Sequence, residues 1–267
     1  MSTYTLLVFD CDGTFLNDAG EVLDSTKQAL RKCSEKGIKI AFASGRAKEG
    51  IENVIKKIQA DNLIDYYICH NGARIYDADE GRYLADKHLV LADYPDLLKL
   101  AEGSELGFYA FANGQILAYN QDDAYADEEA GKNSVPVNPM ADAPLETQIY
   151  KFVIPGSPEK LDRLQDSLPE EITEQYSVVR SAQTNLEFLH PDASKGIGIQ
   201  MLCDSIGYNV EQALPFGDAQ NDYSMYEATG NMIAMGNAQS CLKDIATMIT
   251  DDNNHDGIVR AIKTIVL

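Results

Sequence analysis

Near its start the chain carries the stretch YTLLVFDCDGTFLND, residues 4–18. The first part, YTLLVFD, is a nearly continuous apolar run with too little alternation for a half-exposed strand, which predicts a strand buried on both faces. This strand runs into Asp10 and Asp12, and Gly13 and Thr14 follow. Two carboxylates so close to each other repel, so we expect a cation between them or a proton on one of them.

The bulk composition is that of an ordinary globular protein, with 267 residues, 45% apolar and 24% charged. The length suits one domain with an insertion. We expect no membrane span and no signal peptide, because no long apolar run and no basic-then-apolar start occurs. Five cysteines without a CxxC pair disfavour zinc and a disulfide framework, and indicate reduced thiols in a cytoplasmic protein. A net charge of −20 disfavours nucleic acid and anionic membranes as partners.

The two ends of the chain share one pattern, in which strands and helices alternate. Such alternation implies right-handed crossovers and a parallel sheet, so the fold class expected is α/β, with a Rossmann-like doubly wound parallel sheet as the core. The predicted strands are 4–10, 38–45, 66–72, 213–218 and 231–236, and the predicted helices are 24–37, 47–60, 194–207, 222–230, 239–249 and 255–266.

The middle of the chain has a different pattern. Residues 107–120 alternate around Asn113-Gly114, which is typical of a β-hairpin. We also expect strands at 148–154, 176–181 and 185–189, helices at 93–103 and 158–168, and a solvated acidic face at 121–131. The sequence therefore predicts an α/β domain at 83–188, inserted into a core formed by 1–82 plus 189–267.

In open parallel sheets, ligands bind beyond the carboxyl ends of the strands. Polar residues and glycines follow four of the predicted core strands: Asp10, Asp12, Gly13 and Thr14; Ser44, Gly45 and Arg46; Asn71 and Gly72; and Gly217, Asp218, Asn221 and Asp222. Four carboxylates at one rim favour a hard cation with oxygen ligands, and we therefore predict Mg²⁺.

Two further residues are ambiguous when each is taken alone. Ser44 is interpreted first as a cap for a helix beginning at Arg46 or Ala47, although such a helix start also binds anions. Lys195 stands in the first turn of a predicted helix, where the helix dipole disfavours a cation. This position suggests that Lys195 counters phosphate charge. Arg46 and Arg74 are open candidates for substrate contact, and Cys11 is interpreted as a packing residue.

The motifs DCDGT, ASGR, SKG and GDAQND, in this order, resemble the four motifs of the haloacid dehalogenase (HAD) superfamily of phosphohydrolases. The long insertion between the second and third motifs resembles the α/β cap domain of the Cof-type, type IIB branch. HNGA at 70–73 and DASKGIGIQML at 192–202 match that branch too, so the resemblance covers essentially the whole chain.

The resemblance implies a HAD-like core and a phosphatase acting on small phosphorylated metabolites. Sugar phosphates are the default class, and phosphorylated vitamins are an open alternative. Asp10 would be the nucleophile and Asp12 the general acid, with Mg²⁺ held by Asp10, the backbone carbonyl of Asp12, and Asp218. The implied phosphate-binding residues are Ser44, Gly45, Lys195 and Asn221, and the supporting residues are Asp222, Thr14, Asn71 and Arg46.

Three other functions stay open at this point. A phosphosugar mutase on the same fold would replace water by a sugar hydroxyl. A response-regulator receiver also gathers acids and Mg²⁺ beside a lysine, but it is about half this length, and its acceptor aspartate follows a later strand, where this chain has Ser44. A catalytically silent binding protein ranks last, because every expected catalytic residue is present.

Overall fold

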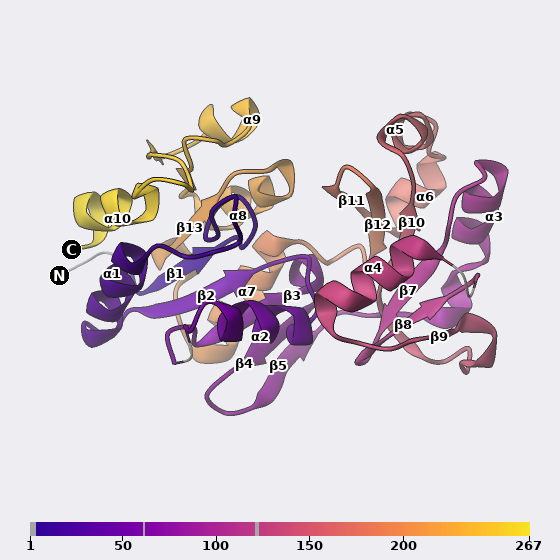
Figure 1. Ribbon diagram of the computed structural model, residues 1–267, viewed down its shortest axis with the longest axis horizontal. Coiled ribbons are helices and arrows are strands. Elements are labelled where there is room, and N and C mark those ends of the chain that lie inside the picture. The colour runs from indigo at the N-terminus through magenta and orange to yellow at the C-terminus, as the bar shows by residue number, and fades with distance from the viewer. Residues whose placement is uncertain (1–3, 61, 121–122) are drawn as a thin grey trace. The chain divides into compact units, whose positions relative to one another are not determined.

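The computed structural model describes residues 4–60, 62–120 and 123–267, and these form two compact units. The core unit comprises Met1–Asp86 and Ser194–Leu267, and the inserted unit comprises Lys87–Ala193 (Figure 1). The inserted unit thus begins and ends a few residues later than the expected 83–188. Residues Arg82–Asp86 stay with the core because they form a strand of its sheet, and Lys87 forms an ion pair with Asp192 inside the inserted unit.

The core unit is built on an eight-stranded sheet with the order β15-β14-β13-β1-β2-β3-β4-β5. From β15 to β3 the neighbouring strands are parallel, whereas β4 and β5 form an antiparallel hairpin at one edge. The strands are β1 Leu6–Phe9, β2 Lys39–Ala43, β3 Tyr66–Cys69, β4 Arg74–Asp77, β5 Arg82–Asp86, β13 Ala213–Gly217, β14 Ile233–Ala234 and β15 Met248–Ile249.

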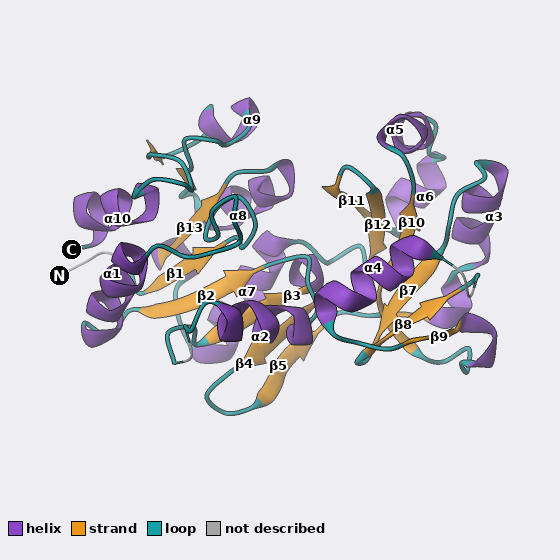
Figure 2. Ribbon diagram, in the orientation of Figure 1, coloured by secondary structure: helices purple, strands orange, loops and turns teal. Residues whose placement is uncertain are grey.

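Helices cover both faces of this sheet, which confirms the doubly wound α/β core (Figure 2). Leu7 and Phe9 of β1 pack with one set of helices, and Leu6 and Val8 pack with the other. The first set is α1 Asp24–Glu35, α2 Lys48–Lys57 and α10 Gly257–Ala261, and the second is α7 Lys195–Ile206, α8 Tyr223–Thr229 and α9 Ser240–Lys243. The π-helix Ile262–Val266 follows α10, and short 3-10 helices span His70–Gly72, Val210–Gln212 and Gln220–Asp222.

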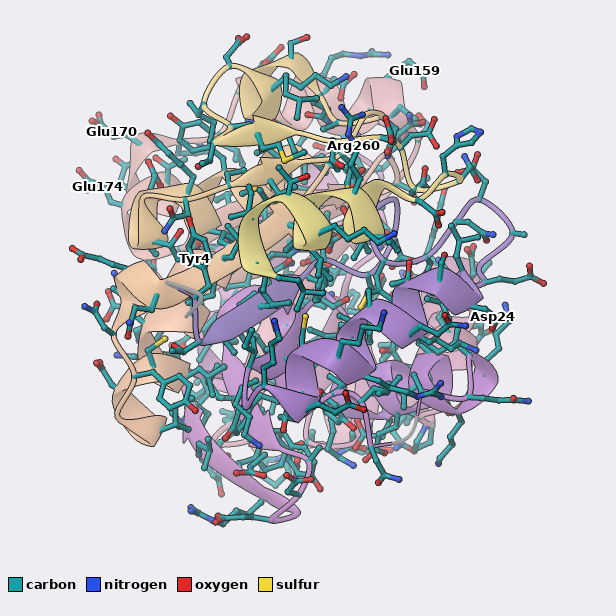
Figure 3. All side chains as sticks on the ribbon, turned by 90° about the vertical axis from the view of Figure 1, so that its left-hand side faces the viewer. Tyr4, Asp24, Glu159, Glu170, Glu174 and Arg260 are labelled. Carbon is teal, nitrogen blue, oxygen red and sulfur yellow. The ribbon has the colours of Figure 1, made fainter. Side chains whose placement is uncertain are left out.

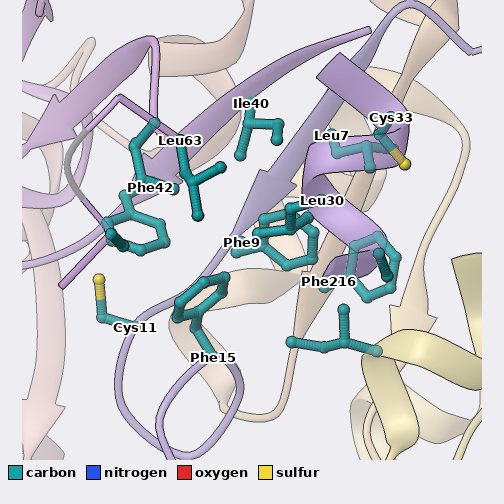
Figure 4. Packing of buried hydrophobic residues seen from close by; sticks show 14 of the residues in the cluster. Leu7, Phe9, Cys11, Phe15, Leu30, Cys33, Ile40, Phe42, Leu63 and Phe216 are labelled. Carbon is teal, nitrogen blue, oxygen red and sulfur yellow. The ribbon is translucent and has the colours of Figure 1, made fainter. Parts of the chain in front are cut away.

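An aromatic cluster anchors the loop after β1 to the core (Figure 4). The ring of Phe15 lies 4.7 Å from that of Phe42 and 5.4 Å from that of Phe9, both edge-on. Cys11 is completely buried in the same cluster, so its interpretation as a packing residue is confirmed. The loop between Phe9 and Phe15 is therefore held at both ends by buried rings, which fixes the backbone that carries Asp10 and Asp12.

The inserted unit has its own sheet, with the order β11-β12-β10-β7-β8-β9 and β6 paired to β10. The hairpin predicted around Asn113-Gly114 is confirmed, since Ala112 pairs with Gln115 across the turn. Its elements are β6 Leu89–Val90, β7 Tyr109–Ala112, β8 Gln115–Ala118, β9 Val137–Pro139, β10 Gln148–Pro155, β11 Ser177–Ala182, β12 Asn185–Leu189, α3 Pro95–Gly103, α4 Ala124–Asn133, α5 Pro158–Asp166, α6 Glu170–Gln175 and the 3-10 helices Leu91–Asp93 and Met140–Asp142.

Some local expectations differ from the structure. The helix predicted over 239–249 is wrong beyond Lys243, because Met248–Ile249 instead forms β15, paired in parallel with β14 at the sheet edge. The solvated acidic face expected at 121–131 is confirmed for the described residues, since it lies largely on helix α4, where Asp127 and Glu128 are exposed; residues 121–122 lie outside the described part of the chain. Among the described residues, no helix combines the length and the apolar character that crossing a membrane requires.

Candidate active site

The carboxyl ends of four core strands carry the predicted site residues. Asp10 follows β1, Ser44 follows β2, Asn71 follows β3 and Asp218 follows β13. In the sheet, β1 lies between β13 and β2, and β3 is next to β2. Because these strands are parallel, their loops meet at one edge of the sheet, and side chains far apart in the sequence become neighbours.

Lys195 is the buried cation of this edge. It is the first residue of α7, it is 1% exposed, and its Nζ lies 2.5 Å from Oδ1 of Asp10 and 2.6 Å from Oδ1 of Asp222. Burial opposes a charge on Lys195, but the two carboxylates outweigh this effect and raise its pKa above the usual range. Lys195 is therefore an ammonium group at neutral pH, even though it opens a helix.

Asp222 holds two parts of the site together. Its Oδ1 accepts the bond from Lys195, while its Oδ2 accepts the backbone N–H groups of Asp218 and Ala219, each at 3.0 Å. The side chain is completely buried. One carboxylate therefore orients the lysine and also shapes the turn that carries Asp218.

The carboxylates of Asp10, Asp218 and Asp222 converge, with one oxygen of each lying within 4.8 Å of the others. Burial raises the pKa of Asp218 to about 6. The hydrogen bond that Thr14 Oγ1 donates to Oδ1 of Asp218, at 2.7 Å, lowers this pKa but does not cancel the shift. Burial also raises the pKa of Asp10 well above its usual range, although Lys195 opposes the shift. Lys195 thus offsets only part of the negative charge, and a bound cation would offset more.

Two glycines permit the close approaches on which this cluster depends. Gly13 has φ +82°, and a Cβ at this position would lie 2.5 Å from Oδ2 of Asp218. Gly72 has φ +99°, and a Cβ there would lie 1.9 Å from the carbonyl oxygen of Ser194, just before α7. A side chain at Gly13 would displace Asp218, and one at Gly72 would displace the start of the helix that carries Lys195.

Asp12 has a cation of its own. Arg46 binds its carboxylate through Nε and Nη2, at distances of 2.9 to 3.1 Å. Asp10 therefore pairs with Lys195 and Asp12 with Arg46, which explains how two carboxylates so close in the sequence can both follow β1. Arg74, the other arginine considered from the sequence, lies on β4 with its guanidinium carbon 3.4 Å from the ring centroid of Tyr83.

Ser44 is buried at the end of β2, and its Oγ accepts the backbone N–H of Arg46 at 3.2 Å. It does not cap α2, which begins only at Lys48. The expected helix start at Arg46 or Ala47 is therefore wrong, and the hydroxyl closes the turn before the helix instead.

The loops after β2, β3 and β13 also meet. Oδ1 of Asn71 accepts the Nδ2 group of Asn221 at 3.3 Å. A Cβ on Gly45 would lie 3.2 Å from Nδ2, the side-chain amide nitrogen, of Asn71. The structure thus brings Gly45, Asn71 and Asn221 together.

Sequence reasoning missed two asparagines that support the loop after β1. Asn237 donates from Nδ2 to the carbonyl oxygen of Gly13 at 2.7 Å, and its Oδ1 accepts the backbone N–H of Asn253 at 3.2 Å. Asn253 donates in turn to the carbonyl oxygen of Leu16. Asn237 follows β14, so the rule applied to the other strand ends would have found it.

The chain is similar to known phosphatases along almost its whole length. A family model of haloacid dehalogenase-like hydrolases matches residues 7–262. The Bacillus subtilis protein named "Putative phosphatase YxeH" is 30% identical over 99% of each chain. The 5-amino-6-(5-phospho-D-ribitylamino)uracil phosphatase YcsE of the same organism is 26% identical, over 98% of this chain and 96% of its own.

Solved structures show the same fold. A haloacid dehalogenase-like hydrolase from Bacteroides thetaiotaomicron has a TM-score of 0.83 and 28% identity, covering 98% of this chain and 99% of its own. The HAD subclass IIB sugar phosphatase BT4131 has a TM-score of 0.81 over 97% and 98% of the two chains, and at 24% identity the likeness concerns the fold alone. With the family model matching most of its length, the chain belongs to the haloacid dehalogenase-like hydrolases, in their Cof-type branch, and is a phosphatase.

Proposed function

We propose that the chain is a Mg²⁺-dependent phosphatase that hydrolyses small phosphomonoesters, sugar phosphates above all, through an aspartyl phosphate on Asp10. The observation that carries the proposal is the setting of Asp10. Asp10 follows directly after β1. Its carboxylate accepts a hydrogen bond from the ammonium group of Lys195 and lies beside the carboxylate of Asp218. A nucleophile needs such a fixed position and a compensated charge before it can approach an anionic phosphate ester.

In the first step, an oxygen of Asp10 attacks phosphorus, and the bond from phosphorus to the ester oxygen breaks. Asp12 must enter this step in its protonated form, and it gives that proton to the departing alkoxide, which leaves as an alcohol. In the second step, Asp12 takes a proton from water, and the resulting hydroxide attacks phosphorus while the bond from phosphorus to the Asp10 oxygen breaks, so that inorganic phosphate leaves and the Asp10 carboxylate is regenerated.

The transferring phosphoryl group must be held while its charge redistributes. Lys195 carries a fixed positive charge at this edge, and Asp222 keeps its ammonium group in place. We assign the phosphoryl oxygens to Lys195, to the Ser44–Gly45 loop and to Asn221.

The donor set fits a hard divalent cation. Asp10 and Asp218 offer converging carboxylates whose pKa values are raised, and Gly13 leaves room for Asp218 beside the loop after β1. Both oxygens of Asp222 already accept hydrogen bonds, so Asp222 is the weaker candidate ligand. We assign Asp10, Asp218 and the backbone carbonyl of Asp12 as the ligands. When bound, Mg²⁺ would neutralise negative charge shared by the nucleophile and the phosphate.

The substrate class is supported by one relative. The B. subtilis phosphatase YcsE takes, by its name, a phosphorylated ribitylamino compound, which is a phosphomonoester on a polyhydroxylated carbon chain. We propose that the present chain acts on esters of the same chemical kind and that the inserted unit, as the cap domain, selects among them.

A panel of phosphate esters, scored by release of phosphate with Mg²⁺ and with a chelator, tests this function. Asp10→Asn should abolish release with every ester, while Asp251→Asn, which changes a half-exposed carboxylate paired with Arg260, should keep it. More than a few per cent of activity left in Asp10→Asn would contradict the mechanism. Full activity in the chelator would contradict the metal requirement.

A further inference from the structure

Asp12 is held differently from the other carboxylates of the site. The side chains of Asp10 and Asp222 are 11% and 0% exposed and share Lys195, whereas that of Asp12 is 61% exposed. Within the described part of the chain, Arg46 is the residue whose side chain donates hydrogen bonds to the Asp12 carboxylate. Burial therefore does not fix the direction of the Asp12 carboxylate, and the arginine does.

The contact has the geometry of a fork. Nε of Arg46 donates to Oδ2 of Asp12 at 3.1 Å, and Nη2 donates to Oδ1 at 2.9 Å and to Oδ2 at 3.0 Å. A planar guanidinium that engages both oxygens restricts the rotation of the carboxylate as well as its position. A lysine ammonium, as a point charge, would restrict mainly the distance.

Arg46 can position another group because its own backbone is anchored. Its N–H donates to Oγ of Ser44 at 3.2 Å, and its carbonyl oxygen accepts the N–H of His70 at 2.9 Å. His70 and Asn71 both have positive φ angles, of 49° and 53°. This conformation is uncommon for residues with side chains, and its occurrence twice in a row indicates a loop held by its surroundings.

We propose that Arg46 is the positioning residue for Asp12, and that its fork aims the Asp12 carboxyl group at the departing ester oxygen. Oδ2 accepts two bonds from Arg46 and Oδ1 accepts one, so Oδ1 is the oxygen assigned to carry the proton. The inference rests on the proposed function, in which Asp12 gives that oxygen a proton. It differs from the alternative in which Arg46 binds the phosphoryl group directly, because an arginine on the phosphate would affect every ester alike.

The test compares kcat/KM for an alkyl phosphate, such as glucose 6-phosphate, with kcat/KM for p-nitrophenyl phosphate. An alkoxide needs a proton to depart, and an activated aryl oxide needs it far less. Arg46→Met should lower kcat/KM for the alkyl ester by about 10- to 100-fold more than for the aryl ester. Asp12→Asn should show the same selectivity, and the double variant should be no worse than Asp12→Asn alone.

Three controls make the test decisive. Arg260→Met removes an arginine from a half-exposed ion pair of the same unit and should leave the ratio of the two kcat/KM values unchanged. Arg46→Lys keeps the charge without the fork, so its ratio should shift in the same direction as in Arg46→Met. It also serves as the test variant if Arg46→Met does not fold. The inhibition constant of inorganic phosphate should stay within a few fold of the wild-type value in both Arg46→Met and Arg46→Lys.

Equal losses with the two esters, an additive double variant, a wild-type ratio in Arg46→Lys, or a large loss of phosphate inhibition would each overturn the positioning role. These outcomes are distinct from failure of the proposed function, in which Asp10→Asn would remain active.

Discussion

The ammonium group of Lys195 lies 2.6 Å from Oδ1 of Asp222, and the two side chains are 1% and 0% exposed. Because Asp222 also accepts two backbone N–H groups with its other oxygen, it links the start of α7 to the turn after β13. Neither charge can reach water if the other is removed. The pair therefore contributes to the stability of the core unit as well as to the arrangement of the site.

Asp222→Asn should for this reason reduce both stability and activity. Removing one partner of a buried ion pair typically costs 3–5 kcal/mol, and we expect about 3 kcal/mol because Lys195 keeps Asp10 as a partner. Activity should fall at least roughly tenfold, since Lys195 and the turn of Asp218 lose their common support. Urea unfolding without divalent cations and kcat/KM with Mg²⁺ measure the two effects.

The matched control for this variant is Asp251→Asn, which removes the charge of a half-exposed aspartate paired with Arg260. Exposed pairs contribute little, so this variant should unfold at nearly the wild-type urea concentration. If Asp222→Asn were as stable as Asp251→Asn, the linking role of Asp222 would be wrong.

Gly13→Ala should inactivate the enzyme by displacing Asp218. Its Cβ would lie 2.5 Å from Oδ2 of Asp218, and alanine at φ +82° is also strained. Gly37→Ala is the control for backbone strain alone, because Gly37 has φ +79° and a Cβ at this position would have no atom within 4 Å. Both variants should lose about 1–2 kcal/mol of stability from the backbone conformation. Only Gly13→Ala should also lose activity, together with the thermal stabilisation that Mg²⁺ would give at the proposed metal site. Equal activity of the two variants would contradict this explanation of Gly13.

Much of the site was predictable because strand ends in a parallel sheet share one edge. The rule needs only the order of apolar runs and the polar residues that follow them, and it found Asp10, Ser44, Asn71 and Asp218 without knowledge of any contact. The bidentate contact from Arg46 to Asp12 was not predictable in this way, because it depends on side-chain directions in two separate loops. The sequence did not show why residue 72 must be a glycine, for a similar reason. The atom that a Cβ there would overlap is the carbonyl oxygen of Ser194, which is far away in the sequence.

Local pattern failed where tertiary pairing overrides it. Residues 245–249 continue a helical spacing, yet Met248–Ile249 becomes an edge strand because it pairs with β14. The β4–β5 hairpin was missed because its two strands are short and carry charged residues, and it is stabilised by pairing with β3.

The core unit should lose stability at alkaline pH, because two thiols that are buried in the folded protein ionise more readily once the chain unfolds. Burial raises the pKa of Cys33 and that of Cys203 to about 11, whereas an unfolded cysteine titrates near 8.5. Between roughly pH 8.5 and 11 the folded protein retains protons that the unfolded chain has lost, so stability is fully present below this window and falls as the pH rises through it. Urea midpoints from pH 8 to pH 11 should therefore decrease, and less steeply in Cys33→Ala/Cys203→Ala. An unchanged slope in that double variant would exclude the two thiols as the cause.

The inserted unit carries more than its share of the negative charge. Residues 87–193 contain 19 Asp and Glu against 7 Lys and Arg, a net charge of −12 out of −20 for the chain. Several of these acids, such as Glu159, Glu170 and Glu174 of α5 and α6, are exposed and project outward (Figure 3). If the inserted unit acts as the cap, as we propose, a substrate with a second phosphate should meet repulsion that a monophosphate largely avoids.

We therefore expect kcat/KM to be higher for a hexose or pentose monophosphate than for the matching bisphosphate, with a gap that narrows as salt is added. Two unit charges ~4 Å apart near a protein surface interact by roughly 4 kcal/mol, and salt screens exposed charges beyond about 10 Å. A residual repulsion of only about 1.4 kcal/mol is a tenfold difference in rate constant. Measurements in low and in moderate salt, with p-nitrophenyl phosphate as the reference ester, separate this effect from general inhibition by salt. If the acids only keep the surface hydrated, salt will change both sugar phosphates equally. A bisphosphate that is the better substrate at low salt would refute the electrostatic selection, while the phosphatase activity itself would stand.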